Sequence, residues 1–327
     1  MKLFIKFKLR KYFDFSFKTK IIFLIINISY ILFIGDGQND YIDKKDIRIA
    51  LCTMGKEENL YVNEFVEYYI KIGIDHIFIY DDNESDVEKI VNFIDKKYLD
   101  NITIYETKKY NIDNQSIAFT QCYKNNLNKF DWFLMVDMDE FLYIINDTLK
   151  GYLTKRRFNK CDFIKIHWVY PRNNNLIYYE SKPLFERLKP PYEKSNFIKS
   201  IIRGNISNLR YWVHSPYISP KRNITCNNIG KKIYYKEMNF ESLRKINIDK
   251  AYIIHFEFKS TEEFINKIKR GYKNWFGNNI ESFLIKKILF YLKINGASAE
   301  KINFIEKELE INISKYIKKS SYLKYVL

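Results

Sequence analysis

The sequence of 327 residues predicts an α/β fold in which a mostly parallel sheet is flanked by helices. Short apolar runs rich in β-branched and aromatic residues, typical of buried strands, alternate with amphipathic segments of helical spacing. Two of these runs end at clusters of acidic residues, and open α/β sheets bind ligands beyond the carboxyl ends of their strands. The alternation favours parallel strands joined by right-handed crossovers.

The elements of the N-terminal half follow one another at short intervals. Residues 47–53 are predicted to form the first strand. Residues 57–72 carry apolar side chains at helical spacing, and Gly73 is a suitable residue to end that helix. The elements that follow are a strand at 76–80, a helix at 87–97, a strand at 102–106, a helix at 116–128 and a strand from Trp132.

The second half of the chain is less regular and rich in aromatic residues. The predicted elements there are strands at 198–203, 211–214 and 251–258 and a helix at 261–272. Residues 280–327 have the pattern of two Lys-rich amphipathic helices. We therefore expect one folded domain over residues 47–279 and a helical C-terminal extension over 280–327.

The N-terminus has a membrane-targeting pattern. Residues 1–20 are basic, residues 21–34 form an apolar run, and residues 35–46 form a polar stem. As a helix the apolar run would reach only ~21 Å, against a hydrocarbon core of ~30 Å, although flanking lysines can extend such a span. We expect a single-pass type II anchor with the basic tail in the cytosol; a cleaved signal peptide ending near Gly35 is the rival interpretation.

Composition excludes some classes of protein. Hydrophobic residues make up 46% and aromatic residues 17% of the chain, which argues against disorder. The formal charge of +16 accompanies a Lys-rich composition, and the sequence has no RNP motif, zinc-finger spacing or compact basic block, so no nucleic-acid partner is expected. The four cysteines form no Cys-x-x-Cys pair, and buried free thiols are the default interpretation, with one or two disulfides left open.

The most informative segment is Trp132–Phe141, an apolar run that stops at Asp137, Asp139 and Glu140. Alternation along the strand is predicted to point Asp137 and Asp139 to the same side, where both can reach one divalent cation or the phosphates that it holds. A solvated strand end is the plain alternative for two spaced acids. A third acid directly after them favours a functional site.

Other polar residues follow other predicted strands. Asp81 and Asp82 lie where a doubly wound fold meets the base and ribose of a nucleotide, although a polar turn would look the same. Neither a Gly-x-Gly-x-x-Gly nor a Gly-x-x-x-x-Gly-Lys motif is present. His255 ends a predicted strand and is a candidate third metal ligand beside carboxylates, or else a satisfied core histidine. His214 is a candidate contact to phosphate or to a second substrate.

Several of these segments together resemble glycosyltransferase family 92 and related family-2-like glycosyltransferases, and they occur in the same order. The segments are Ile49–Thr53, Lys56–Glu58, Tyr80–Asp86, Trp132–Phe141, Lys199–Arg203, His214–Pro216 and His255 with Lys259–Phe264. The resemblance covers about residues 47 to 275. Its Asp-x-Asp-Glu-Phe element is fairly specific.

The resemblance implies a GT-A fold, a nucleotide-sugar donor such as a UDP-sugar, a glycan acceptor and a divalent metal such as Mn²⁺. It also implies transfer with inversion, often of galactose. Carried over by position, Asp137 would face the donor ribose or the metal, and Asp139 would be a catalytic metal ligand. The remaining donor-binding positions would be Thr53, Glu58, Asp81, Asp82, Lys199 and His214.

Two departures from the family pattern leave the general base open. The family's Lys-Asn-Glu is Lys56-Glu57-Glu58 here, and Val169–Asn175 replaces a Gly-rich stretch. Glu186 and Glu257 are the main candidates for the general base, and Glu180 is a further candidate. A phosphotransferase of the haloacid-dehalogenase type is a poor alternative, because it needs Thr or Val where this chain has Phe141. The non-enzymatic alternative is a catalytically inactive, membrane-tethered glycan-binding or scaffold protein.

The anchor and the resemblance together predict where the protein works. A type II anchor would place the catalytic domain in the lumen of the Golgi or endoplasmic reticulum, where nucleotide sugars are supplied. A secreted or a bacterial membrane-associated protein is the alternative.

Overall fold

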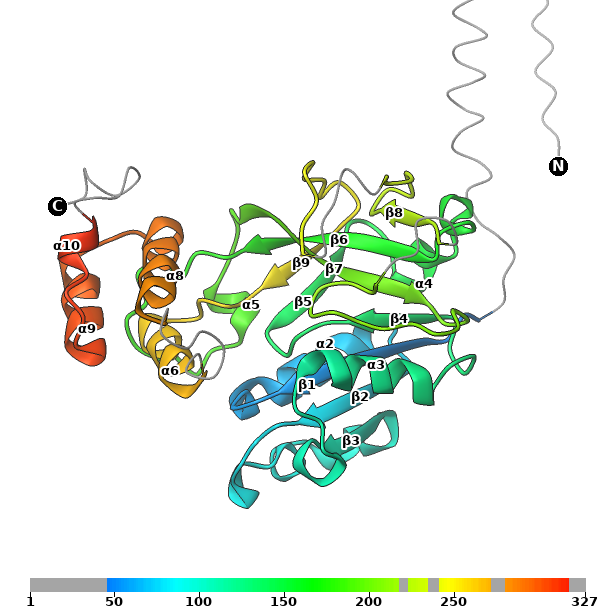
Figure 1. Ribbon diagram of the computed structural model, residues 1–327, viewed down its shortest axis with the longest axis horizontal. Coiled ribbons are helices and arrows are strands. Elements are labelled where there is room, and N and C mark those ends of the chain that lie inside the picture. Colours follow the sequence, from blue (N-terminus) through cyan, green and yellow to red (C-terminus); the bar gives the residue numbers. More distant parts are fainter. Residues whose placement is uncertain (1–45, 218–222, 235–240, 272–279, 318–327) are drawn as a thin grey trace, which may run out of the picture. The chain divides into compact units, whose positions relative to one another are not determined.

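The protein is described by a computed structural model that covers residues 46–217, 223–234, 241–271 and 280–317 (Figure 1). Residues 44–327 form one unit, within which all of these segments lie. The predicted tail at 1–20, the anchor or signal segment at 21–34 and nearly all of the predicted stem at 35–46 lie outside the described residues.

A single mixed sheet organises this unit. Its strands, in spatial order, are β3 (Ile102–Glu106), β2 (His76–Asp81), β1 (Ile49–Gly55), β4 (Trp132–Met135), β7 (Glu193–Arg203), β6 (Phe163–Tyr170), β9 (Ala251–His255) and β5 (Glu140–Ile144), and β8 (Thr225–Asn227) pairs with β6. The four strands from β3 to β4 are parallel, as predicted. β7 runs antiparallel to β4 and β6, and β5 runs antiparallel to β9, so the sheet is mixed rather than mostly parallel in its second half.

Helices cover both faces of the parallel strands. Ile49 and Leu51 of β1 belong to the core that includes α2 (Val62–Ile72), whereas Ala50 and Cys52 belong to the core that includes α3 (Gln115–Asn125). The period of two along a strand explains this division. Gly73 ends α2 with a left-handed φ of 107°, the conformation that glycine adopts without strain.

Because of the strand directions, many strands end at the same edge of the sheet. β1, β2, β4, β6 and β9 all finish there, because β6 is parallel to β9 and both β4 and β6 are antiparallel to β7. β5 and β7 begin at the same edge. This edge, called the carboxyl edge below, therefore collects residues far apart in sequence.

The C-terminal helices pack beside this sheet (Figure 1). They are α6 (Thr261–Gly271), α8 (Ile280–Asn295), α9 (Ala299–Leu309) and α10 (Ser314–Ile317); α4 (Leu149–Leu153) and α5 (Leu184–Arg187) are shorter. Phe264 of α6 stacks on Tyr291 of α8 with ring centroids 4.3 Å apart. Buried residues of α6, α8 and α9 belong to the same hydrophobic core as those of the sheet.

Three expectations about local structure are wrong. The predicted helix at 87–97 is a series of short 3₁₀ turns, because Asp81 Oδ2 accepts a hydrogen bond from the Ile90 backbone and holds the segment against β2. The predicted strand at 211–214 is a bend with one bridge between Tyr211 and Pro216.

The default interpretation of the cysteines as free thiols is the third. All four are bridged, Cys52 to Cys122 and Cys161 to Cys226. Cys52 lies on β1 and Cys122 on the helix α3 that covers it. The fold therefore brings together two cysteines that are far apart in the sequence. The first bridge ties α3 to the sheet.

The described helices contradict the prediction that this is a single-pass type II membrane protein. Among the residues that the structure describes, no helix has the length and apolar character needed to cross a membrane. The longest of those helices, α8, has 16 residues and would reach ~24 Å.

Candidate functional site

The acidic residues of Trp132–Phe141 lie in a tight turn between β4 and β5 at the carboxyl edge. The Glu140 backbone donates to the Asp137 carbonyl at 3.1 Å, and the Asp137 backbone donates to Glu140 Oε2, also at 3.1 Å. Because Asp137 and Asp139 lie in a turn, strand alternation does not orient them. Each carboxylate has its own partners.

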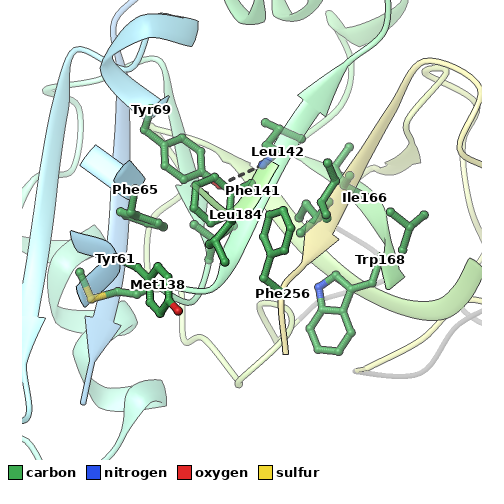
Figure 2. Close-up of a cluster of buried hydrophobic side chains, with 14 of the residues drawn as sticks. Tyr61, Phe65, Tyr69, Met138, Phe141, Leu142, Ile166, Trp168, Leu184 and Phe256 are labelled. Atoms are coloured by element: carbon green, nitrogen blue, oxygen red, sulfur yellow. Dashed lines mark hydrogen bonds between the residues drawn. The ribbon is translucent and has the colours of Figure 1, made fainter. Parts of the chain in front are cut away.

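An aromatic core supports the turn from behind (Figure 2). Phe141 packs against Phe65, Tyr69 and Phe256, with ring centroids 5.7, 6.1 and 5.3 Å away. The buried Tyr69 hydroxyl donates to the Glu140 carbonyl at 2.7 Å and accepts from the Leu142 backbone at 3.0 Å. The residues that follow the turn are therefore fixed by both packing and hydrogen bonds.

Met138 occupies the middle of the turn and packs on the last residue of β1. It is 2% exposed, and a Cβ added to Gly55 would lie 2.1 Å from its sulfur atom. No side chain larger than hydrogen fits at position 55 unless Met138 moves. Gly55 therefore sets how closely the acidic turn approaches β1.

Asp137 lies beside a buried lysine. Lys199 of β7 donates to Asp137 Oδ1 at 2.7 Å and lies 3.6 Å from Glu140 Oε1, and Gln115 at the start of α3 also donates to Asp137. Burial, followed by the charge of Asp137, raises the pKa of Glu140 well above its usual value. Burial alone would lower the pKa of Lys199, but the charges of Asp137 and Glu140 raise it instead, so this lysine is a cation at neutral pH.

Asp139 lies beside a histidine and a second lysine. The pairing of β5 with β9 places His255 opposite Glu140, and His255 Nε2 lies 3.4 Å from Asp139 Oδ1. Lys267 of α6 donates to Asp139 Oδ2. Burial opposes ionisation of Asp139, yet the charge of Lys267, followed by the interaction with His255, holds the pKa of its carboxyl well below the usual range.

The side chains at this turn can be compared with the ligands that the predicted metal ion would need. No three His, Cys, Asp or Glu side chains within the described ranges are arranged to hold a metal ion, so the predicted set of Asp137, Asp139 and His255 does not assemble. Asp139 and His255 do assemble, and His255 Nδ1 is buried without a hydrogen-bond partner. One or two protein ligands suffice for a cation that shares the phosphates of its substrate. The pair fits a cation of that kind.

The residues predicted to bind the nucleoside, Thr53, Asp81 and Asp82, lie at the ends of the neighbouring strands β1 and β2. Thr53 is fully buried near the end of β1, and its hydroxyl has no hydrogen-bond partner. Asp82 is half-buried and accepts from the Thr107 hydroxyl at 2.7 Å. Both oxygens of Asp81 accept bonds from the following turn, from Asn83 and from the Ile90 backbone, so its carboxylate serves the fold.

Glu58 connects this region to the C-terminal half. Its carboxylate accepts from Lys259 at 2.5 Å, and the Lys259 ammonium lies 4.3 Å from the centre of the Tyr61 ring. Arg187 of α5 donates to the Tyr61 hydroxyl at 2.5 Å. The loop after β1 is thereby held to the segments that precede α6 and β7.

The two candidate bases have different surroundings. Glu257 is 6% exposed, two residues after His255, and forms an ion pair with Lys287 of α8. Burial alone would raise its pKa, but the charge of Lys287, followed by the interaction with His255, lowers the pKa of Glu257 below its usual value. Glu186 lies exposed on α5.

His214 lies inside the site rather than at its surface. Its Nδ1 lies 3.1 Å from the Ile198 carbonyl, and its ring packs 5.0 Å from that of Trp168. Burial, then the charge of Lys199, lowers the pKa of His214 to about 3. At neutral pH it is uncharged, so it can offer a hydrogen bond but no charge to a phosphate.

Sequence reasoning missed the lysines that neutralise the acidic residues. They are Lys259, Lys267 and Lys287. In a chain with 55 Lys and Arg residues, nothing in their composition or spacing separates them from solvent-exposed lysines. Gln115, which contacts Asp137, was also missed; its place at the start of a helix after β3 was the available signal.

Comparison with known proteins gives the following similarities. A sequence model of the family described as Glycosyltransferase family 92 matches residues 45–288. A protein of Oryza sativa subsp. japonica named for that family is 27% identical over 128 residues, 37% of this chain and 21% of that protein. One of Ricinus communis, also named for it, is 27% identical over 103 residues, 31% of this chain and 18% of that protein. The matched part of the chain therefore spans about a fifth of the length of these relatives.

A solved structure is also similar over part of its length. It is the apo structure of WbbM, described as a bifunctional glycosyltransferase, which is 12% identical and matches 48% of this chain and 33% of that chain with a TM-score of 0.25. At this score the likeness does not establish a shared fold.

Proposed function

The chain belongs to glycosyltransferase family 92, and on this premise we propose that it transfers a sugar from a nucleotide-sugar donor to a glycan acceptor. The observation that carries the proposal is the meeting of Asp139 and His255 at the carboxyl edge, beside strand ends with an unpartnered Thr53 hydroxyl. Buried polar atoms without partners are rare in folded proteins, and a bound ligand is one explanation for them. We take the sheet to be of the GT-A type and the donor to be a UDP-sugar.

We propose that a divalent cation such as Mn²⁺ enters with the donor. Asp139 and His255 would hold it, and it would neutralise the diphosphate leaving group. Lys199 and Gln115 hold Asp137 in place, at the side of the turn nearest α3. Thr53 and Asp82 would contact the nucleoside at the ends of β1 and β2.

The proposed reaction is a single displacement with inversion. The acceptor hydroxyl attacks the anomeric carbon, the bond to the diphosphate breaks, and a carboxylate takes the hydroxyl proton. We assign this last role to Glu257 because it is unprotonated at neutral pH and lies two residues after His255. Replacing Glu257 with Gln should then abolish transfer, whereas Glu186→Gln, at an exposed position of α5, serves as the comparison. Loss of transfer in Glu186→Gln alone would reverse the assignment.

A donor screen tests the enzymatic proposal. The full chain is incubated with UDP- and GDP-sugars, with and without Mn²⁺, and release of the nucleoside diphosphate is measured. We expect hydrolysis of at least one donor that depends on Mn²⁺ and falls at least 100-fold in Asp139→Asn, an effect in the range seen when one transition-state contact is removed. The matched control is Asp147→Asn, which also disturbs a lysine-paired aspartate, but after the far end of β5.

The screen also tests the alternative, a catalytically inactive glycan-binding or scaffold protein. One observation favours that alternative: Lys199 and Lys267 already neutralise Asp137 and Asp139. If no donor is hydrolysed under any metal condition, the inactive alternative is the better one. Hydrolysis that is independent of added metal would instead assign neutralisation of the diphosphate to the lysines.

A further inference from the structure

A groove of about 640 Å³ lies between α3 and the bend at residues 210–217 that follows β7. Neither Asp139 nor His255 lines it, but two of its lining residues contact Asp137 and Lys199 at the other side of the acidic turn. Gln115, which lines the groove, donates to Asp137. Val213, which also lines it, accepts from Lys199 at 3.1 Å. One end of the groove therefore shares residues with the candidate site.

Two aromatic side chains are held at the surface of this groove. Trp212 is 42% exposed and Tyr217 is 49% exposed, with ring centroids 6.3 Å apart. Large exposed aromatic rings are costly to leave in water, and they commonly mark binding surfaces. Their faces are suited to the C–H face of a sugar ring, and their polar ends to its hydroxyls.

The remaining lining is rich in hydrogen-bonding groups. Gln121 and Lys124 project from α3, and Arg210 lies on the opposite wall. None of the described residues that line the groove is acidic. A small number of placed polar groups around an apolar platform is the usual composition of a small-ligand site, and sugar hydroxyls accept bonds from amides and cations alike.

The walls are fixed before any ligand arrives. Tyr211 is buried, with its backbone N–H donating to the Thr120 hydroxyl at 2.9 Å and its ring 5.3 Å from that of Phe119. Within the bend, the Trp212 backbone donates to the Ser215 carbonyl at 2.9 Å, and the Tyr217 backbone to the Arg210 carbonyl at 2.8 Å. A groove with preorganised walls loses little entropy when it binds.

We propose that this groove binds the acceptor glycan, with one sugar ring stacked on Trp212 and flanked by Tyr217, whose ring is inclined by 66° to that of Trp212, and with the reacting end directed along α3 towards Gln115 and Asp137. The inference rests on the proposed glycosyltransferase function and adds the place and mode of acceptor binding. Donor binding at the strand ends and acceptor binding in the groove then use different residues.

The test uses the full chain, three variants and two independent readouts. Binding to a printed array of neutral and acidic oligosaccharides reports on the groove, and calorimetric titration with UDP and Mn²⁺ reports on the donor site. Trp212→Ala and Tyr217→Ala remove the platform; Tyr178→Ala removes a ring that is 61% exposed and does not line the groove. Thermal denaturation checks that each variant is folded.

We expect the wild type to bind a set of glycans and Trp212→Ala to lose at least tenfold in affinity for them, with Tyr217→Ala weakened and Tyr178→Ala unchanged. UDP affinity should stay within twofold of wild type in all three. Glycan binding that survives both groove substitutions, or that is undetectable in the wild type, would overturn the proposal. A loss of UDP affinity in Trp212→Ala would also overturn it, by assigning the groove to the donor. Absence of UDP binding in the wild type, with glycan binding intact, would instead count against the proposed function alone.

Discussion

Gly55 is the residue whose size most directly controls the acidic turn. Its place against Met138 lets the turn between Asp137 and Asp139 approach the end of β1. Met138 is buried and has little room to move. Position 55 therefore couples the packing of β1 to the geometry of the two carboxylates.

Replacing Gly55 with Ala should displace Met138 and the turn with it. Overpacking a well-packed site costs about 1–3 kcal/mol, so we expect a lower free energy of unfolding together with at least a tenfold loss of donor hydrolysis. Urea denaturation and the hydrolysis assay measure the two effects. Gly55→Ala combined with Met138→Ala should cost less stability than the sum of the two single changes, because the second change makes room for the added Cβ; normal activity in Gly55→Ala alone would refute this role.

His167 gives a separate prediction about acid stability. It is fully buried on β6, its Nδ1 lies 3.0 Å from the Asn247 carbonyl, and burial lowers the pKa of His167 to about 4. An unfolded histidine titrates near 6.5, so between pH 6.5 and 4 the unfolded state binds a proton that the folded state does not. The free energy of unfolding should therefore fall as the pH falls through this window, by about 3 kcal/mol at pH 4 from this residue.

The comparison that isolates this effect is His167→Asn, whose amide can keep the contact with Asn247. Urea denaturation at pH 7 and at pH 4.5 should show a smaller loss of stability with acid in His167→Asn than in the wild type. Other groups contribute equally to both proteins. If the free energy of unfolding depends on pH in the same way in both proteins, His167 does not cause the loss of stability in acid.

At the scale of elements, α3 is held to the sheet by a covalent bond as well as by packing. Cys52 and Cys122 are separated by 70 residues in the chain, and Cys161 and Cys226 by 65. Loops of this length give a chain-entropy stabilisation of about 4 kcal/mol per bridge. Only the first bridge touches a wall of the proposed glycan groove.

Removing each bridge should separate stability from binding. Cys52→Ala/Cys122→Ala and Cys161→Ala/Cys226→Ala should each lower the free energy of unfolding by up to about 4 kcal/mol in urea denaturation. Glycan binding, measured at a temperature where both variants are folded, should weaken only in the first. Equal weakening in both would mean that α3 does not need its bridge to shape the groove.

The elements also show which parts of the fold a sequence can predict. The sequence predicts the bounds of four features to within one or two residues: β2, β3, the end of α2 at Gly73, and α6. It can do so because the periodicity of apolar residues and helix capping are local signals. The pairing of β5 with β9 was not predictable, since it joins segments over a hundred residues apart and gives no local signal. The segment 87–97 was misassigned because a bond from Ile90 to Asp81 outweighs its helical pattern.

At the scale of the molecule, the carboxyl edge is where the two halves of the chain meet. The N-terminal half supplies Glu58 and Asp139, and the C-terminal helices and the segments before them supply Lys259, Lys267 and His255. The sequence pointed to Asp139 and His255 as candidates, because both follow apolar runs. It did not indicate that lysines would face the acidic side chains, since charge pairing across the fold depends on tertiary structure.

The most direct test of the central claim is the affinity for UDP, measured by calorimetry with and without Mn²⁺. Wild-type protein should bind UDP at least tenfold more tightly when Mn²⁺ is present, and Asp139→Asn should lose this enhancement while Asp147→Asn keeps it. That result is expected if Asp139 and His255 hold a cation that shares the diphosphate. An affinity that is equal with and without Mn²⁺, or unchanged in Asp139→Asn, would contradict the assignment of the acidic turn as the donor-diphosphate site.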